Sequence, residues 1–585
     1  MRDRRNTILS VSSMSSTGST HSGRSSLSEK FSLSPPASPT LPPPVTKENR
    51  RRTRYSRLTL VKLLASIAAS LLLLRVVLCW PRPAIGSSNT QLLPDEIFAD
   101  TRASPSEPAA VIVPDASGRP KWTVSIPQNS SSPLDDKQYA DICSAGEVLR
   151  EKLVQKSRIG RFVDVRRRTG YYTKDWTYLD VSEAERSRAS TIPSRYNTSK
   201  VCTTSLTFAL DPNEASFGKS LLMLWLSYGL AKHEGRAFFV DDTRWAYGRY
   251  TSYFATIPDQ GCAPPPKYHI VPCPHQAKHL LVSAATAQWT FGALFERQFT
   301  PKRNGHGKRY KRIFALVRRG YEDLFALVGD DAAYAQARIA DLRNEVAAHA
   351  GSVVGMHIRR GDLHPHERQY SGDYLPLERY AAEAKSLLLS KQSDRGSGNN
   401  TTTNDRYESA LDEEHSSLLL ASDDPDILTS SSLAHAISPL PVQRAQGRIQ
   451  LATKATLDRT SPVSALREPG SAYVKHVDEN SGWEGGFFSA LFYSLGNSQE
   501  STLKRLSQLP GSASVVSEQA MRMRELVGRA YLLDLAVLGE SDGVVCAVSS
   551  AACRVLGVMM GWEAVREGRW VNVDDGRPWS WDGGR

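Results

Sequence analysis

Hydrophobic positions beyond Asp136 alternate between two patterns, one typical of helices and one typical of buried strands. Apolar residues recur at helical spacing over Tyr139–Gln155. The strand-like run Thr204–Leu210 is followed by the polar loop DPNEASFGK and by the apolar helical segment SLLMLWLSYGLAKH, which stops before Gly235. Ala237–Val240 has the pattern of the next strand. This strand–helix–strand order predicts a parallel α/β lobe over residues 136–350.

A second set of elements predicts another α/β lobe over residues 351–585. Its first strand begins at Val353, and the helical segment YLPLERYAAEAKSLLL and the strand HSSLLLASDDPDIL follow. Near the C-terminus we expect a helix at Gly528–Leu538, a buried strand at Gly543–Val548 and a helix that opens at Ser549. Two polar, poorly patterned stretches near residues 390–414 and 439–473 are predicted insertions.

The first 135 residues follow neither pattern. Residues 1–57 are basic and rich in Ser and Pro, so we expect a disordered tail. Residues 58–80 are apolar and long enough to span a bilayer, although Lys62 and Arg75 are costly there. The arginines that precede them favour a signal anchor with a cytoplasmic N-terminus, and a buried core helix is the alternative. Residues 81–135 are rich in Pro and Ser and are predicted to form a stem.

The location of the charge argues against a nucleic-acid partner. The chain carries a net charge of +12, but residues 1–57 hold 11 Lys and Arg against 3 Asp and Glu, which is +8 of that total. The other 528 residues carry only +4 and show no basic patch with interleaved aromatic residues.

Two further features fit a lumenal location for everything beyond the anchor. Acceptor sequons for N-glycosylation occur at Asn129, Asn197 and Asn400. Six of the seven cysteines lie beyond residue 80, and an even number suits disulfides, although six cysteines allow fifteen pairings. We therefore expect a single-pass membrane protein of the secretory pathway.

Polar groups follow the predicted strands of the second lobe. The first strand runs into HIRRGD, where Arg359 and Arg360 are costly to bury unless an anion meets them, and Asp362 is placed to hold one of them. Carboxyl ends of parallel strands meet at one edge of a sheet, so a nucleotide site is the economical interpretation. A surface salt-bridge cluster and an Arg-Gly-Asp adhesion tripeptide are the alternatives. The other polar groups expected at this edge are Asp423, Asp424, Asp534, Ser549 and Ser550.

These residues also have plain structural interpretations. Ser549 and Ser550 at a helix start would offer hydroxyl and N–H groups to a phosphate, or would simply cap the helix. Asp534 would accept hydrogen bonds from a guanine edge, or form an ion pair with a neighbouring basic side chain. Gly218 opens the apolar helix of the first lobe, where free N–H groups would meet a phosphate or form an ordinary turn.

The motif HIRRGD resembles the His-x-Arg-Arg-x-Asp signature of α1,6-, α1,2- and protein O-fucosyltransferases, and the residues after it are most similar to the α1,6 branch. The resemblance covers roughly residues 201–581 and is strongest at 353–380 and 528–556. It implies a GT-B-like fold of two lobes, the second Rossmann-type and binding GDP-fucose. Together with the predicted signal anchor, it leads us to expect a type II protein of the Golgi or another secretory membrane. It also implies the disulfides Cys202–Cys262 and Cys546–Cys553, which leaves Cys143 and Cys273.

The resemblance assigns roles to individual residues. Arg359 would bind the β-phosphate of the donor, and His357 with Asp534 would contact guanine. The loop at Gly218 would border the donor. Other family site positions fall on Arg360, Asp362, Tyr380, Asp423, Asp424 and Ser550.

The expected chemistry is a single displacement. A carboxylate must take the proton of the acceptor hydroxyl, and Glu367 is our candidate base. Arg359 would stabilise the departing diphosphate, so no metal or other cofactor is expected, although Asp424-Pro425-Asp426 superficially resembles an Asp-x-Asp metal motif.

One position departs from the family. Leu363 stands where the α1,6 branch has a lysine, and His364 or His366 would have to replace it. The sequence therefore leaves three hypotheses open beside an α1,6-fucosyltransferase acting on glycans: transfer to another acceptor such as a chitooligosaccharide or a protein hydroxyl, an inactive protein that binds sugar nucleotides or glycans, and a cytosolic adhesion or scaffold protein. It does not name the acceptor, the linkage or the oligomeric state.

Overall fold

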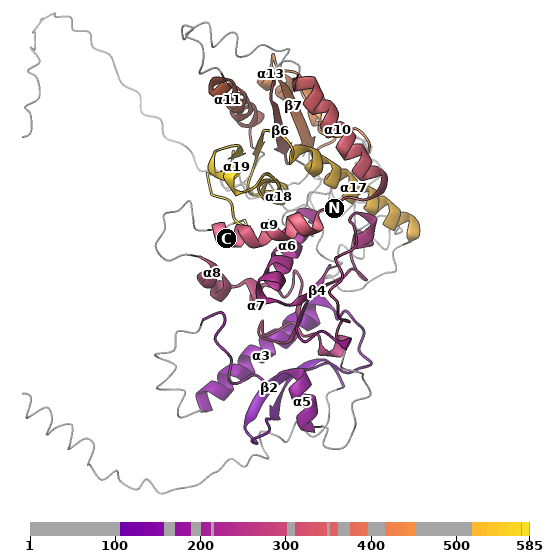
Figure 1. Cartoon of the computed structure of the whole chain (residues 1–585), viewed down its shortest axis with the longest axis vertical. Coiled ribbons are helices and arrows are strands. Elements are labelled where there is room, and N and C mark those ends of the chain that lie inside the picture. The colour runs from indigo at the N-terminus through magenta and orange to yellow at the C-terminus, as the bar shows by residue number, and fades with distance from the viewer. Residues whose placement is uncertain are drawn as a thin grey trace, which may run out of the picture. The chain divides into compact units, whose positions relative to one another are not determined.

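The computed structural model describes residues 106–156, 170–188, 200–211, 216–300, 310–347, 351–360, 375–395, 416–450, 517–574 and 576–583. All of them belong to one compact unit, Thr90–Arg585 (Figure 1). The predicted tail and the predicted span at residues 58–80 lie outside the described residues. Within the described ranges, each helix is too short or too polar to cross a bilayer.

The folded region begins earlier than predicted, inside the expected stem. Ala109–Pro114 (β1) and Pro120–Ser125 (β2) form an antiparallel hairpin. Its residues Trp122 and Val124 share a core with Tyr139 and Ile142 of the helix Asp136–Lys156 (α3), and Val181–Arg188 (α5) also packs on the hairpin. The stem prediction was wrong for this part because two six-residue strands are too short to show in a composition rich in Pro and Ser.

The first parallel sheet has three strands in the order β4-β3-β5: Ala237–Asp241, Ser205–Ala209 and His279–Val282. The helix Phe217–Glu234 (α6) connects β3 to β4 and begins at Ser216, whose hydroxyl accepts a hydrogen bond from Lys219 N. It ends at Gly235, whose φ of 67° is accessible to glycine at little cost. The predicted strand–helix–strand unit is confirmed.

Two glycines allow α6 to approach the helix Lys311–Leu324 (α9) closely. A Cβ atom on Gly229 would lie 2.1 Å from the carbonyl oxygen of Leu316, and one on Gly320 would lie 2.3 Å from that of Trp225. The two helices therefore pack backbone against backbone, as their crossing in Figure 1 shows.

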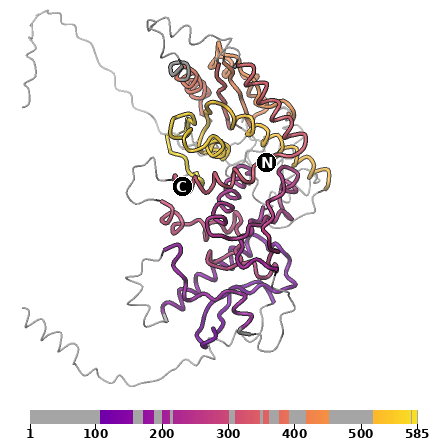
Figure 2. The backbone as a smooth tube through the Cα atoms, viewed as in Figure 1, coloured from indigo at the N-terminus to yellow at the C-terminus, as the bar shows by residue number. Residues whose placement is uncertain are grey.

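The second sheet has five parallel strands in the order β10-β9-β6-β7-β8. Figure 2 shows the yellow C-terminal segment beside the strands β6 and β7, which come from much earlier in the chain. The α/β class predicted from the sequence is thus confirmed, with two parallel sheets. The five strands are β6 (Val353–Ile358), β7 (Ser417–Ser422), β8 (Val442–Arg444), β9 (Gly543–Cys546) and β10 (Trp570–Asn572).

Both predicted insertions overlap regular structure. β8 lies inside the predicted insertion 439–473, and the helix Leu377–Arg395 (α11) extends into the insertion predicted at 390–414. A three-residue edge strand whose residues are only half buried has no apolar run that a sequence pattern could detect. These two boundaries are corrected accordingly.

Helices from both halves share one hydrophobic core. Ala551–Met560 (α18) contacts α6 and α9, and Arg318 of α9 donates hydrogen bonds to the carbonyl oxygens of Val558 and Met559 at the end of α18. Gly329–Ala347 (α10) was predicted to be the end of the first lobe, but it packs on β6 and on Glu518–Leu538 (α17) and so belongs with the five-stranded sheet. The remaining elements are η3 (Tyr250–Ser252), η4 (Lys267–His269), α7 (Ala287–Phe291), α8 (Ala293–Phe299), η6 (Ile427–Thr429), α13 (Ser431–Ile437) and α19 (Trp562–Arg566).

Three disulfides join cysteines of the described ranges: Cys143–Cys273, Cys202–Cys262 and Cys546–Cys553. They include both pairs implied by the family resemblance.

Candidate functional site

The carboxyl ends of β6, β7 and β9 meet at one edge of the five-stranded sheet. Arg360 N donates a hydrogen bond of 2.6 Å to Asp423 Oδ1, and Ser422 Oγ donates one to the carbonyl oxygen of Ile358. These bonds join the residues that follow β6 to those that follow β7. The convergence expected from the sequence is therefore present for this part of the site.

A positively charged side chain is buried at the end of β6. Arg359 is only 4% exposed, and His357, on the buried strand before it, is also 4% exposed. A guanidinium group carries donors only, and burying it is costly unless acceptors surround it. The end of β6 is thus suited to bind a group rich in negatively charged oxygen atoms.

Asp423 and Asp424 are buried at the end of β7, and their carboxylates contact backbone N–H groups. Asp423 accepts from Arg360, and Asp424 Oδ1 accepts from Asp426 N at 3.1 Å. Their described contacts give both residues a role in shaping the turn. Among the residues that the structure describes, no group of three or more His, Cys, Asp or Glu side chains is placed to hold a metal ion.

The turn after β9 leads directly into α18. Ser550 is the N-cap residue with an extended backbone, and the disulfide Cys546–Cys553 joins the end of β9 to the first turn of the helix. Ser549 Oγ is buried and has no hydrogen-bond partner among the described residues. The N-terminus of α18 also contributes the partial positive charge of a helix dipole.

Asp534 lies on α17 beside the residues that follow β8. Part of its side chain still reaches solvent, yet burial of the carboxyl group raises its pKa to about 8, an effect that Arg444 and hydrogen bonds from Gln446 only partly offset. The carboxyl group is therefore largely protonated at neutral pH. Its neighbours place Asp534 at the same edge of the sheet as the ends of β6, β7 and β9.

Arg444 and Gln446 were missed at the sequence level because they fall inside the predicted insertion. The segment 445–450 is held by α10, where Arg338 donates to the carbonyl oxygens of Arg444 and Ala445. Asp331 of α10 binds Arg448 of the segment and Arg529 of α17 at 2.9 and 2.6 Å. The only sequence signal was the run of arginine and glutamine in VQRAQGR, which is too common to be diagnostic.

Two further predicted donor residues lie on helices, α11 and α6. Tyr380 of α11 is 1% exposed and packs in the core with Met356 and Ile358 of β6. Gly218 lies in the first turn of α6, and its neighbour Phe217 packs on Tyr531, one turn before Asp534. Asp362 and Glu367 lie outside the described residues, as do Leu363, Asn197 and Asn400. Asn129 is exposed in a turn after β2.

Comparison with solved structures finds a remote similarity to crystal structures of a fucosyltransferase. Crystal structures of the NodZ α-1,6-fucosyltransferase, one co-crystallised with GDP and one soaked with GDP-fucose, each align at 11% identity with TM-scores of 0.25 and 0.28. These alignments cover 60% and 61% of this chain and 91% and 92% of NodZ. A third structure, of NodZ from Bradyrhizobium, aligns at 12% identity with a TM-score of 0.26. No family model and no curated protein sequence matches the chain. Because these TM-scores are below 0.5, we base the following proposal on this chain's own residues.

Proposed function

We propose that the chain is an inverting, metal-independent glycosyltransferase that transfers fucose from GDP-fucose to a glycan acceptor through an α1,6 linkage. The observation that carries the proposal is the edge of the five-stranded sheet, where the buried Arg359 and the N-terminus of α18 lie at the ends of neighbouring parallel strands. Ligands of open α/β sheets bind outside the carboxyl ends of the strands. The resemblance of HIRRGD to the fucosyltransferase signature supports GDP-fucose as the donor.

In this proposal one part of the edge binds the diphosphate and another part binds guanine. Arg359 and Arg360 bind the diphosphate oxygens, and Ser549 and Ser550 offer hydroxyl and N–H groups at the start of α18. His357 and Asp534 contact guanine. An ionised carboxylate is the natural acceptor for the N–H groups of a guanine edge, so bound GDP would favour the charged form of Asp534 and lower its pKa.

The reaction is a single displacement at the anomeric carbon of fucose. The acceptor hydroxyl oxygen forms a bond to this carbon while the bond to the β-phosphate oxygen breaks, and the electron pair leaves with GDP. Glu367 takes the hydroxyl proton, and Arg359 stabilises the negative charge that develops on the diphosphate. One displacement inverts the configuration and converts a β-linked donor into an α-fucoside. Arginine supplies the cationic stabilisation, so the proposed mechanism needs no metal ion.

The apolar residues 58–80 would anchor the chain in the Golgi or another secretory membrane, with the GT-B-like catalytic part in the lumen. The sequons at Asn129, Asn197 and Asn400 would then be available for glycosylation in that compartment.

A second candidate function follows from Leu363, which replaces the lysine of the α1,6 branch. The chain would then bind GDP-fucose, or a glycan, without transferring the sugar. A third possibility is an active fucosyltransferase that uses another acceptor, such as a chitooligosaccharide or a protein hydroxyl.

The test is a transfer assay with labelled GDP-fucose and a panel of glycans, chitooligosaccharides and peptides, with and without EDTA. We expect transfer that EDTA leaves unchanged and that falls at least about 100-fold in Arg359→Ala and in Glu367→Gln. Arg569→Ala, which removes an exposed ion pair with Glu567, is the matched arginine control. Donor binding without transfer would favour the inactive protein, and absence of GDP binding would overturn the donor assignment.

A further inference from the structure

The segment after β8, residues 445–450, lies beside α17 at the edge of the five-stranded sheet. Arg444, the last residue of β8, donates a hydrogen bond of 3.3 Å to the carbonyl oxygen of Pro425 in the turn after β7. Gln446 is 6% exposed and donates hydrogen bonds from its backbone and its side chain to Asp534 of α17. The segment therefore reaches the part of the edge that is proposed to contact guanine.

The side-chain amide of Gln446 is fixed by the backbone of its own segment. Its Nε2 donates to the carbonyl oxygen of Ile449 at 2.8 Å, and its Oε1 accepts from Ile449 N at 3.0 Å. An amide nitrogen carries two N–H groups, so one remains for Asp534. The direction of the amide, and with it the contact to Asp534, depends on where the backbone of residues 445–450 lies.

One carboxylate of α10 joins this segment to α17. Asp331 Oδ1 contacts Arg448 Nε at 2.9 Å, and Asp331 Oδ2 contacts Arg529 Nε of α17 at 2.6 Å. Arg529 Nη2 also donates to Asp331 Oδ1 at 2.9 Å, so this arginine binds both carboxylate oxygens. The side chain of Asp331 is 12% exposed and those of the two arginines are each 31% exposed. Partly buried pairs of this kind are screened less than surface pairs.

The carboxylate of Asp331 is charged at neutral pH. Burial raises its pKa, but hydrogen bonds from Arg529 and Arg448 and their charges outweigh burial and hold the pKa below its ordinary value. The helices α10 and α17 also pack through Ala335 and Leu533, so their contact does not depend on the carboxylate alone. The additional effect of Asp331 is to hold the segment after β8 against α17.

We propose that Asp331 is a positioning residue for recognition of the nucleotide base. It fixes residues 445–450 against α17 and so holds Gln446 on Asp534, whose carboxylate accepts from the N1–H and 2-amino groups of guanine. The inference rests on the proposed function for the contact between Asp534 and guanine. Asp331 acts through the segment and Asp534 rather than by touching the nucleotide.

The experiment compares two nucleotides that differ in one group of the base. GDP carries the 2-amino group, and inosine diphosphate (IDP) lacks it but has the same diphosphate. Calorimetric titration of the full-length chain in mild detergent, at about pH 8.5, measures both Kd values. The ratio of the Kd for IDP to the Kd for GDP reports base recognition, whereas a general loss of structure changes both values together.

We expect the wild-type chain to prefer GDP, and Asp331→Asn to reduce this preference about 5-fold, because the hydrogen bonds at the charged Asp534 are weakened. The loss is partial because Arg338 and Tyr334 of α10 still bind the backbone of the segment. Arg448→Ala should reduce the preference in the same way with a smaller fall in Tm, since Asp331 then keeps its pair with α17.

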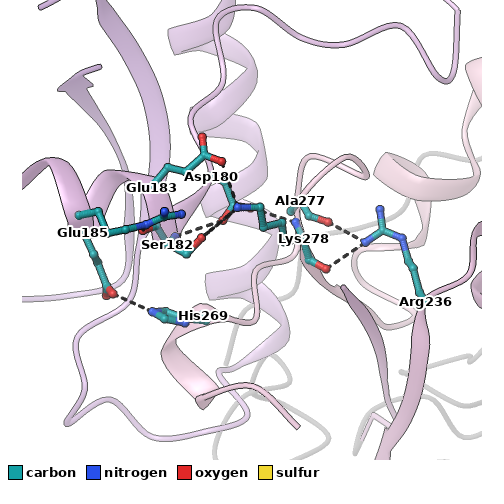
Figure 3. A network of polar contacts seen from close by, with 9 residues as sticks. Asp180, Ser182, Glu183, Glu185, Arg236, His269, Ala277 and Lys278 are labelled. Atoms are coloured by element: carbon teal, nitrogen blue, oxygen red, sulfur yellow. Dashed lines mark hydrogen bonds and ion pairs between the residues drawn. The ribbon is translucent and has the colours of Figure 1, made fainter. Parts of the chain in front are cut away.

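Two matched controls separate base recognition from stability. Figure 3 shows Asp180, whose side chain is 13% exposed and which joins α5 to β5 by accepting a hydrogen bond from Lys278 N at 2.9 Å. Asp180→Asn should lower Tm and leave the Kd ratio unchanged. Arg343→Ala breaks an exposed ion pair between α10 and Glu540, just after α17, and should also leave the ratio unchanged.

The outcomes distinguish this inference from the proposed function. An equal loss of GDP and IDP affinity in Asp331→Asn, or the same change of ratio in Asp180→Asn, overturns the positioning role and leaves the proposed function intact. GDP binding without preference over IDP overturns the guanine contact of Asp534 and the inference with it. Absence of binding of either nucleotide overturns the donor assignment itself. If Asp331→Asn does not fold, Arg448→Ala decides, because it leaves Asp331 paired with Arg529.

Discussion

The carboxyl edges of the two parallel sheets share acids that bind backbone N–H groups, and they differ in a buried arginine. At the three-stranded sheet, which we call the acid edge, acids at or just after the strand ends bind backbone N–H groups of nearby loops. Ala284 N donates to Asp211, Thr243 N to Asp241 and Tyr250 N to Asp242. At the five-stranded sheet, which we call the arginine edge, Asp423 and Asp424 bind backbone N–H groups in the same way, and β6 is also followed by the buried Arg359.

The buried arginine is the feature on which the proposed donor site depends. A carboxylate accepts hydrogen bonds, so it can join loops by binding their N–H groups without any ligand. A guanidinium group only donates and cannot serve N–H groups in this way. Both edges therefore hold loops through acids, and the proposed anion site depends on the buried arginine that, among the described residues, only one of them has.

The largest effect is expected from a pair of matched aspartate variants. Asp423→Ala removes the acceptor of Arg360 N at the arginine edge, and Asp242→Ala removes the acceptor of Tyr250 N at the acid edge. Both variants should lower the Tm. Only Asp423→Ala should weaken GDP binding, by about 10-fold or more, because it releases the segment that carries the arginines. Calorimetric titration checks this, and an equal loss of GDP affinity in both variants would remove the distinction between the edges.

The affinity for GDP should change by roughly 10-fold with pH. The pKa of Asp534 is raised to about 8, chiefly by burial, so the carboxylate that would accept from guanine forms only as the pH rises through this value. The Kd for GDP should fall by about 10-fold between pH 6.5 and 8.5. Asp534→Asn should flatten this dependence, leaving only the part that belongs to the phosphate. A wild-type profile identical to that of Asp534→Asn would separate Asp534 from donor binding.

Loss of the disulfide at the five-stranded sheet should change GDP affinity a few-fold, whereas loss of a disulfide at the three-stranded sheet should not. Cys546 and Cys553 are 7 positions apart and close the turn that contains Ser549 and Ser550, whereas Cys202 and Cys262 are 60 apart. Loop-entropy arguments give the longer loop about 4 kcal/mol and the shorter about 2 kcal/mol of stabilisation. The double variant Cys546→Ser with Cys553→Ser should therefore weaken GDP binding about 3-fold. The double variant Cys202→Ser with Cys262→Ser should lower Tm more and leave GDP affinity unchanged. The reverse pattern would contradict this division.

The smallest effect, a shift of a few degrees in Tm, concerns acid stability. Burial lowers the pKa of His275 and of His279 to about 4, so both remain neutral in the folded protein while the unfolded chain takes up protons below pH 6.5. Their contribution to stability is present above pH 6.5 and is lost as the pH falls to about 4. Asp534 acts in the opposite direction, because its raised pKa stabilises the fold below pH 3.8 and this contribution is lost as the pH rises through 8.

Thermal unfolding between pH 4 and 7 measures this effect. His279→Gln should reduce the fall in Tm at acid pH, and replacement of the exposed His435 should not. An unchanged slope in His279→Gln would show that other groups control acid stability.

Sequence patterns predicted the elements with long apolar runs and missed those that depend on tertiary contacts. The α6 helix and the strands β3, β6 and β9 are buried on all sides, so their composition identifies them. The β1–β2 hairpin is stabilised by α3, and β8 by its pairing with β7 and by Arg338, none of which is local in sequence. For the same reason Arg359 and Asp423 were predicted from strand ends, whereas Gln446 beside Asp534 was not.

The contacts of α18 also decide how far the chain can be divided. This helix follows β9 of the five-stranded sheet, lies on α6 and α9, and has its last carbonyl groups bound by Arg318. A polypeptide that stopped near Ala347 would expose the faces of α6 and α9 that α18 covers. A polypeptide that began at Val353 would expose the face of α18 that α6 and α9 cover. A boundary between the sheets would cut through a single core, so we expect neither half to be transplantable without the other.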